Sequence, residues 1–273
     1  MNISASPPHS PSQQYDANYY ATGCGTPYER NEVWLGQFAR IADRIISDIQ
    51  PKTVMDAGCA MGFLVEALRA CGVAAWGIDI SEYAISQVHE SVRACCAVGS
   101  VTTPFNRRYD LITCIEVLEH LPKAEAEAAI ANFCAHTDDV LFSSSPNDFV
   151  EPTHFNVQPP EYWAEQFARH GFYRDVDADL LHITPWATRF RKVNAPAHQI
   201  ARNYERRFWR LQQENADLRK AIARGSDTDA TLKAQLASSQ MEIAQLKQLV
   251  QAYESGRFMR LMAKVKQFLG RPV

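Results

Sequence analysis

Two acidic residues and the small residues near them form the first stretch of this chain that could bind a ligand. Asp56 ends a short apolar run and is followed by Gly58, Ala60 and Gly62. Small residues at these steps let the backbone turn sharply and let a ligand lie against bare amide groups. Asp79 ends a second apolar run, where a carboxylate can accept hydrogen bonds from both hydroxyls of a ribose. The pattern therefore predicts a site for a nucleoside cofactor.

Three further side chains could take part in proton transfer. Glu119 and His120 follow another apolar run, and His154 lies in a polar, proline-rich stretch. The pKa of histidine suits it to accept a proton from a hydroxyl near neutral pH. His154 is the favoured base because Thr153 and Asn156 beside it offer hydrogen bonds to a polar acceptor. His120 has a structural alternative, which is to cap the helix that follows it.

The elements that would position these residues follow from the hydrophobic pattern. From residue 53 onward, short apolar runs alternate with segments of helical period, which predicts an α/β domain with a parallel, doubly wound sheet. Strands are expected near 53–57, 74–79, 94–98, 109–115, 139–144, 172–177 and 186–191, and helices near 62–71, 81–91, 122–135 and 159–170. Ligands of such sheets bind beyond the carboxyl ends of the strands, where the strand order reverses.

The motif at the first turn narrows the choice of cofactor. Phe63 stands where the dinucleotide fingerprint has its third glycine. The motif that begins at Asp56 instead resembles the Asp/Glu-x-Gly-x-Gly-x-Gly motif of class I S-adenosylmethionine-dependent methyltransferases, with Ala60 in place of the middle glycine. The string EVLEH at residues 116–120 is similar to the small-molecule branch of that superfamily. The resemblance covers residues 19–192 and implies a Rossmann-like, seven-stranded methyltransferase sheet.

The resemblance implies S-adenosyl-L-methionine as cofactor and a set of residues around it. The expected contacts come from the first turn, from the second acid and from the ends of the next strands. Two N-terminal side chains could also contact the methionine carboxylate. Its members are Asp56, Gly58, Ala60, Gly62, Asp79, Ile80, Ser100, Val101, Ile115, Tyr28 and Arg30. Many relatives carry an acid where this chain has Ser100. Tyr28 and Arg30 have a structural alternative, as the lead-in to a helix.

The reaction implied by the resemblance is O-methylation, with His154, His120 and Glu119 as catalytic residues and no metal. The segment at residues 153–163, followed by HGF at 170–172 and ITPWATRF at 183–190, resembles methyltransferases encoded with, or fused to, bacterial polysaccharide glycosyltransferases. That implies a sugar hydroxyl as acceptor, in the biosynthesis of a surface polysaccharide such as O-antigen. Two alternatives stay open. One is methylation of a quinone-like or other small metabolite, and the other is a non-catalytic, methyltransferase-like scaffold.

Composition points to a cytoplasmic protein. The net charge of −3 over 273 residues gives no reason to expect nucleic acid as a partner. Seven cysteines without C-x-x-C spacing are typical of small buried side chains in a reducing compartment. The chain has no segment of signal-peptide form and no apolar run approaching about 18 residues.

The two ends of the chain differ from its middle. Residues 1–18 are rich in Ser, Pro, Gln and Asn, a composition that predicts a disordered tail. Residues 193–254 are expected to form a linker and a coiled coil. Residues 255–273 predict a basic amphipathic helix, which could lie on the inner face of a membrane or bind a partner such as a glycosyltransferase.

A heptad pattern extends from Ala201 to Tyr253, through a weak centre at residues 225–229. A frayed middle and a helix–turn–helix both fit that centre, but the unbroken phase favours one long helix. Ile243 and Val250 at a positions predict a parallel two-stranded homodimer. The alternative is a helix that packs back on the domain.

Overall fold

The computed structural model describes residues 14–223 and 229–255. The chain divides into two compact units. The first runs up to residue 159 and takes in residues 166–192, and the second comprises residues 160–165 and the chain from Val193 onward.

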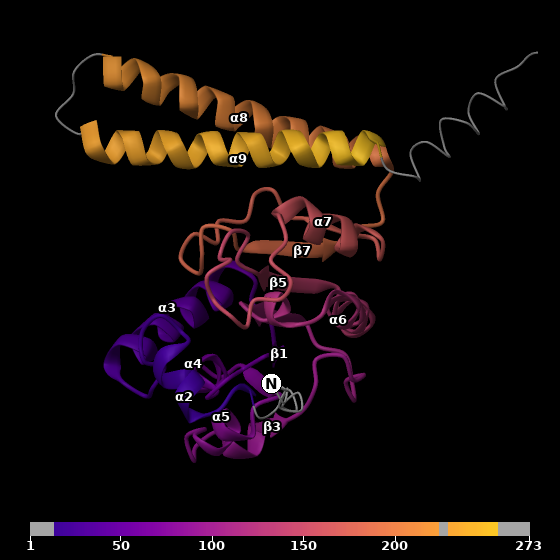
Figure 1. Cartoon of the computed structure of the whole chain (residues 1–273). Coiled ribbons are helices and arrows are strands. Elements are labelled where there is room, and N and C mark those ends of the chain that lie inside the picture. Colours follow the sequence, from indigo (N-terminus) through magenta and orange to yellow (C-terminus); the bar gives the residue numbers. More distant parts are fainter. Residues whose placement is uncertain (1–13, 224–228, 256–273) are drawn as a thin grey trace, which may run out of the picture. The chain divides into compact units, whose positions relative to one another are not determined.

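A seven-stranded sheet in the order β3-β2-β1-β4-β5-β7-β6 forms the centre of the first unit (Figure 1). Its strands are β1 (Thr53–Ala57), β2 (Ala74–Asp79), β3 (Cys96–Val98), β4 (Leu111–Ile115), β5 (Asp139–Ser143), β6 (Phe172–Arg174) and β7 (Thr188–Lys192). Strands β1 to β5 are parallel, and β7 is antiparallel to both of its neighbours. The strand order reverses between β1 and β4. Their carboxyl ends therefore border the crevice where such sheets bind ligands.

Helices connect the strands as the period predicted, with one shorter than expected. They are α2 (Ala17–Thr22), α3 (Glu32–Asp48), α4 (Phe63–Ala70), α5 (Glu82–Ser86), α6 (Lys123–His136) and α7 (Pro160–Ala168), with single 3-10 turns η1 (Arg93–Cys95) and η2 (Leu118–His120). The helix expected over 81–91 ends at Ser86. Nδ1 of His89 lies 2.8 Å from the Ser91 hydroxyl, a local bond that competes with helical pairing.

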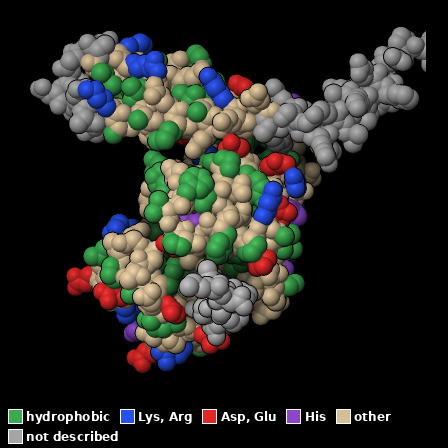
Figure 2. All heavy atoms as spheres, in the orientation of Figure 1, with side chains coloured by type: hydrophobic (Ala, Val, Ile, Leu, Met, Phe, Trp, Pro, Cys, Tyr) green, Lys and Arg blue, Asp and Glu red, His purple; other side chains and the backbone are tan. Residues whose placement is uncertain are grey.

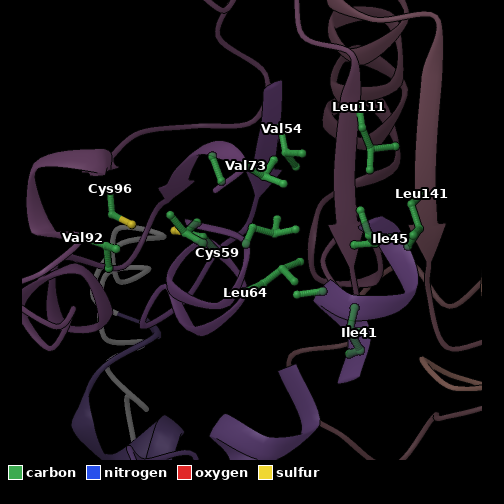
Figure 3. Packing of buried hydrophobic residues seen from close by; sticks show 14 of the residues in the cluster. Ile41, Ile45, Val54, Cys59, Leu64, Val73, Val92, Cys96, Leu111 and Leu141 are labelled. Carbon is green, nitrogen blue, oxygen red and sulfur yellow. The ribbon is translucent and has the colours of Figure 1, made fainter. Parts of the chain in front are cut away.

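Apolar side chains from α3, α4 and the strands meet in one core cluster (Figure 3). Ile41 and Ile45 of α3 are buried there with Leu64 of α4, and Leu111 and Leu141 come from β4 and β5. Burying such a side chain stabilises the fold by about 1.5–3 kcal/mol. This packing fixes the helix that follows the first turn against the sheet, and so fixes the turn itself.

The predicted disordered tail, residues 1–18, lies mostly outside the described residues, but its last part is ordered. Asp16 caps α2 by accepting a hydrogen bond from the Tyr19 amide at 3.0 Å. The Ser81 hydroxyl donates to the backbone oxygen of Tyr15 at 2.5 Å. The boundary at residue 18 is therefore wrong, because Tyr15 and Asp16 already belong to the folded unit.

The second unit contains two long helices, α8 (Ala197–Ala223) and α9 (Asp229–Ser255), that lie side by side (Figure 1). Arg207 forms an ion pair with Glu242 at 3.2 Å, and the Ser239 hydroxyl donates to the backbone oxygen of Leu211 at 3.4 Å. A later residue of α8 thus meets an earlier residue of α9, so the two helices are antiparallel. The single long helix was a wrong prediction, because the described residues form two antiparallel helices.

The heptad pattern predicted one continuous helix because the apolar residues of α8 and α9 share the same heptad phase. Leu211 and Leu246 occupy d positions of the heptad that starts with Ala201 at a, and each is only 1 % exposed within this single chain. The apolar residues that were predicted to form the interface of a parallel homodimer are therefore already buried within one chain. The basic amphipathic helix predicted for residues 255–273 lies almost wholly outside the described residues.

None of the described helices has the length and apolar character needed to cross a membrane. On the face shown in Figure 2, Lys and Arg side chains are spread among acidic and hydrophobic ones. All seven cysteines lie in the described part of the chain and are free thiols.

Candidate active site

The turn between β1 and α4 is left-handed at three positions. Gly58, Ala60 and Gly62 have φ values of 86°, 45° and 72°. A Cβ atom at Gly58 would lie 2.3 Å from Cγ2 of Val117, so only glycine fits there. Ala60 adopts the same backbone region with a side chain, which costs an L-residue about 1–2 kcal/mol. The turn therefore holds a strained, compact shape directly at the carboxyl end of β1.

Asp79, at the end of β2, supports this turn. Its Oδ2 accepts a hydrogen bond from the Ala60 amide and its Oδ1 accepts one from the Ser81 amide, both at 2.8 Å. Burial raises the pKa of this carboxyl group, while the two amide bonds oppose the shift. Each oxygen keeps a second lone pair that a ribose hydroxyl could use. Ile80, the neighbouring predicted contact, is half-buried at the same edge.

Asp56 lies at the end of β1 with 5 % of its surface exposed. The Thr113 hydroxyl of β4 donates to its Oδ1 at 2.6 Å. Burial raises the pKa of Asp56 to about 7; the Thr113 hydrogen bond opposes this and the nearby charge of Asp79 adds to it. Two carboxyl groups thus share one buried region, an arrangement that favours a ligand carrying positive charge.

The two N-terminal side chains have different surroundings. The ring of Tyr28 stacks on Phe63, the first residue of α4, with ring centroids 5.1 Å apart. Burial raises the pKa of the Tyr28 hydroxyl, and the charge of Asp56 raises it further. Arg30 is instead held by Glu66 of α4, which accepts from its two terminal nitrogens at 2.5 and 2.7 Å. The structure therefore brings Tyr28 to the turn and gives Arg30 a structural partner.

The predicted residues after β3 and β4 lie along the same sheet edge. Val101 is buried, and Asn132 of α6 donates to its backbone oxygen at 2.8 Å. The Ser100 hydroxyl lies 2.8 Å from that of Thr102, so part of its hydrogen-bonding capacity is already used. Ile115 is the half-buried last residue of β4.

Glu119, His120 and His154 come together, although they lie on two separate segments. One side-chain N or O atom from each lies within 4.8 Å of those of the other two. Glu119 and His120 sit on η2 after β4, and His154 sits on the loop between β5 and α7. Asn156 ties that loop to η2, because its backbone amide donates to the Glu119 backbone oxygen at 2.9 Å and its side chain to that of Leu118 at 3.4 Å.

Hydrogen bonds place the proton of both imidazoles on Nδ1. The Thr153 hydroxyl donates to Glu151 at 2.9 Å, so it can only accept from Nδ1 of His120, also 2.9 Å away. Nδ1 of His154 lies 3.0 Å from the backbone oxygen of Asp148, which is an acceptor. In the neutral form of each ring, Nε2 then carries the lone pair. Burial, with the neighbouring His154, lowers the pKa of His120 to about 4, which keeps that ring neutral.

Glu119 is fully buried beside these rings. Its Oε1 accepts from the Ser145 amide at 3.1 Å, and its Oε2 has no partner among the described residues. Burial raises its pKa well above the usual range, and the charge of Glu116 adds to the shift. Glu116 has a left-handed backbone, with φ 54°, and accepts hydrogen bonds from the Ser143 hydroxyl and from Trp186. The buried Oε2 atom of Glu119 thus has hydrogen-bonding capacity that the described residues leave unused.

Two roles differ from the expectation. Thr153 and Asn156 were expected to bind the acceptor, but Thr153 orients His120 and Asn156 anchors the loop. Thr113 and Trp186 were not predicted to take part. Thr113 could have been found as a polar residue inside an apolar strand that must pair with the strand of Asp56, whereas Trp186 gave no such signal.

The chain is similar to known methyltransferases in sequence and in fold. A protein-family model described as a methyltransferase domain matches residues 28–219. The ubiquinone biosynthesis O-methyltransferase of Nitrosomonas europaea is 37 % identical over 101 residues, which cover 34 % of this chain and 42 % of that protein. The magnesium-protoporphyrin O-methyltransferase of Synechocystis is 32 % identical over 98 residues, which cover 33 % of this chain and 43 % of that protein.

Among solved structures, the fold is similar to that of a 1,6-didemethyltoxoflavin-N1-methyltransferase from Burkholderia thailandensis with bound 1,6-didemethyltoxoflavin and S-adenosylhomocysteine. That likeness has a TM-score of 0.50 at 15 % identity and covers 70 % of this chain and 94 % of the other. The chain spans less than half of the length of the two curated relatives.

Proposed function

Because the chain belongs to the class I S-adenosylmethionine-dependent methyltransferase family, we propose that it transfers a methyl group to an oxygen atom of a small-molecule acceptor. One observation carries this proposal. Two imidazoles with free Nε2 lone pairs lie beside Glu119, at the same sheet edge as the turn at Gly58 and Asp79. A donor site and a proton-accepting site thus share one edge of the sheet.

The residues present fit S-adenosylmethionine, the cofactor of this family. Asp79 keeps lone pairs for two ribose hydroxyls, and the left-handed turn at Gly58 admits no Cβ. The acidic surroundings of Asp56 suit the positive charges of the cofactor. When bound, it supplies a methyl group on a sulfonium sulfur, and the sulfur leaves as a neutral thioether.

The His120 and His154 pair would serve the acceptor. An acceptor oxygen forms its bond to the methyl carbon as the carbon–sulfur bond breaks, and its own proton must leave. A neutral imidazole with a free Nε2 can take that proton. The Nδ1 hydrogen bonds to Thr153 and Asp148 hold each ring in the tautomer that this task needs.

The relatives support one acceptor class over the other. Their names refer to ubiquinone biosynthesis and magnesium-protoporphyrin, which favours the small-metabolite alternative. The sugar hydroxyl of a surface polysaccharide has no support among these relatives, so we place it second.

The test is transfer of a labelled methyl group from S-adenosylmethionine to a panel of phenolic, quinol and sugar acceptors. His154→Ala should lower turnover by about 10²–10⁴-fold while leaving cofactor affinity close to that of wild type. His89→Ala, which removes a half-buried histidine that is not part of the cluster, is the control. Wild-type protein that binds no S-adenosylmethionine in calorimetry would refute the proposal and favour the scaffold alternative.

A further inference from the structure

Charge is divided unevenly between the two units of the chain. Residues 193–273, which make up most of the second unit, hold 14 of the 28 Lys and Arg residues but only 7 of the 31 Asp and Glu residues, a net charge of +7. Residues 1–192 hold the other 14 basic residues and 24 acidic ones, a net charge of −10. Such a separation favours an anionic partner for the basic unit.

The basic charge is concentrated early in α8, in the segment RNYERRFWR at residues 202–210, which has four arginines and a single acid. Arg207 serves the hairpin itself, through its ion pair with Glu242 at 3.2 Å. Arg202 and Trp209 are seven residues apart, about two helical turns, so they lie on one face of α8. Both side chains are exposed, and Trp209 keeps 60 % of its surface exposed. A large aromatic ring thus lies among basic residues on an open helix face.

This face continues to the end of α8. Lys220 is exposed and comes 18 residues after Arg202, which is about five turns. Its ion pair with Asp217, at 3.3 Å, joins two side chains that are 65 % and 71 % exposed, so it contributes little and can be exchanged for another anion. The opposite stripe of the helix is buried, at Tyr204 and Leu211. Helix α8 therefore packs with one stripe and leaves a basic, Trp-containing face in solvent.

We propose that this exposed face of α8, defined by Arg202, Trp209 and Lys220, binds the surface of an anionic lipid bilayer. Lys and Arg are attracted to the acidic headgroups, and Trp partitions to the boundary between headgroups and acyl chains. Since no helix in the described part of the chain can cross a membrane, the contact is at the surface. Residues 256–273 add five basic residues and no acid to the same unit. Stable attachment of this kind usually needs two such signals.

The charge of the first unit favours a bilayer over a nucleic acid. RNA is the other polyanion that a basic helix attracts. An RNA acceptor would also have to enter the crevice of the first unit, and residues 1–192 have a net charge of −10 that repels it. A bilayer bound to α8 makes no contact with the crevice necessary. The inference goes beyond the proposed function and does not depend on methyl transfer.

The experiment measures sedimentation of the full chain with phosphatidylcholine vesicles, with and without about one third phosphatidylglycerol. We expect binding to the anionic vesicles only, and its loss when salt is raised from about 0.1 M to about 0.5 M, because salt screens exposed charges. Arg202→Glu combined with Lys220→Glu should weaken binding by at least about 30-fold, since each basic residue at an anionic surface contributes about fivefold. Trp209→Ala should weaken it by about 10-fold, because less apolar area is buried.

The matched control combines Arg40→Glu with Lys52→Glu, which changes the net charge equally at two exposed positions of the first unit. This variant should bind vesicles as wild type does. Circular dichroism shows that each variant is folded, and calorimetry with S-adenosylmethionine reports on the first unit separately.

The outcomes separate this inference from the proposed function. Wild-type chain that fails to sediment with anionic vesicles overturns the inference. Binding that survives the double change in α8 also overturns it, because the contact then lies elsewhere in the chain. An equal loss in the control variant would show that only net charge matters, and tighter binding to a single-stranded RNA oligonucleotide at the same salt would make nucleic acid the partner; each contradicts the lipid surface. Vesicle binding that α8 variants lose, in a chain that binds no S-adenosylmethionine, supports the surface and refutes the proposed function.

Discussion

Asp79 has two tasks at the level of the single residue, because it shapes the turn through the Ala60 amide and offers lone pairs to a ribose. Asp79→Ala should therefore weaken S-adenosylmethionine binding by about 1.5–3 kcal/mol, the range for hydrogen bonds to a charged group. Calorimetry measures this directly, with circular dichroism to show that the variant is folded. A folded variant with wild-type affinity would remove Asp79 from the cofactor site.

Asp56 should make the stability of the cofactor-free protein depend on pH. Its pKa of about 7 in the folded state exceeds the unfolded value, so the folded protein holds an extra proton between the two values. Stability from this residue therefore falls as pH rises, by about 1.4 kcal/mol per pH unit until the folded pKa is passed. Urea unfolding of wild type and Asp56→Asn from about pH 5 to about pH 8 tests this. Parallel pH profiles for the two proteins would contradict it.

Ala60 carries backbone strain that glycine would relieve, because its φ is 45°. The left-handed conformation costs alanine about 1–2 kcal/mol. Glycine avoids this cost, but it also stabilises the unfolded chain by about 0.4–1 kcal/mol because it has more conformational freedom there. Ala60→Gly should thus raise the free energy of unfolding by up to about 1 kcal/mol. The matched change Ala67→Gly, inside α4, should lower it by about 0.5–1 kcal/mol. Destabilisation by both changes would show that the Ala60 methyl group packs favourably.

At the scale of elements, the loop between β5 and α7 works only if it stays on η2. Asn156→Ala removes the side-chain bond to Leu118 and loosens His154. We expect kcat to fall about 10- to 100-fold with cofactor affinity unchanged, since displacement of a catalytic group by about 1 Å has effects of this size. Asn147→Ala, an exposed change on the same loop, is the control. An equal effect of both variants on kcat would argue against a specific anchor.

Local patterns predicted the elements of the sheet well, because alternation of strand and helix is encoded within each segment. The turn at Gly58 and the acid at Asp79 could be read for the same reason, since each follows its own strand. The pairing of His120 with His154 could not, because it depends on how the loop after β5 folds back on η2. The partner of Arg30 was missed similarly, since Glu66 lies 36 positions away. The hairpin of α8 and α9 was missed because a heptad phase does not encode a turn.

At the scale of the whole molecule, the hairpin buries its own seam, so it does not require a second chain. The sheet is complete at Lys192. A chain that ends there should fold and bind S-adenosylmethionine, and both it and the full chain should be monomers in sedimentation equilibrium at micromolar concentration. A full-length dimer that the truncation converts to a monomer would instead support self-association through the helical unit.

The two strands at the sheet's borders, β3 and β6, contain three residues each. Short border strands present few unpaired amide and carbonyl groups, and a neighbouring molecule extends a sheet by pairing with such groups. The edges of the folded sheet thus offer few groups with which another chain could form an amyloid-like sheet. We therefore expect the brevity of β3 and β6 to limit edge-to-edge association at high protein concentration.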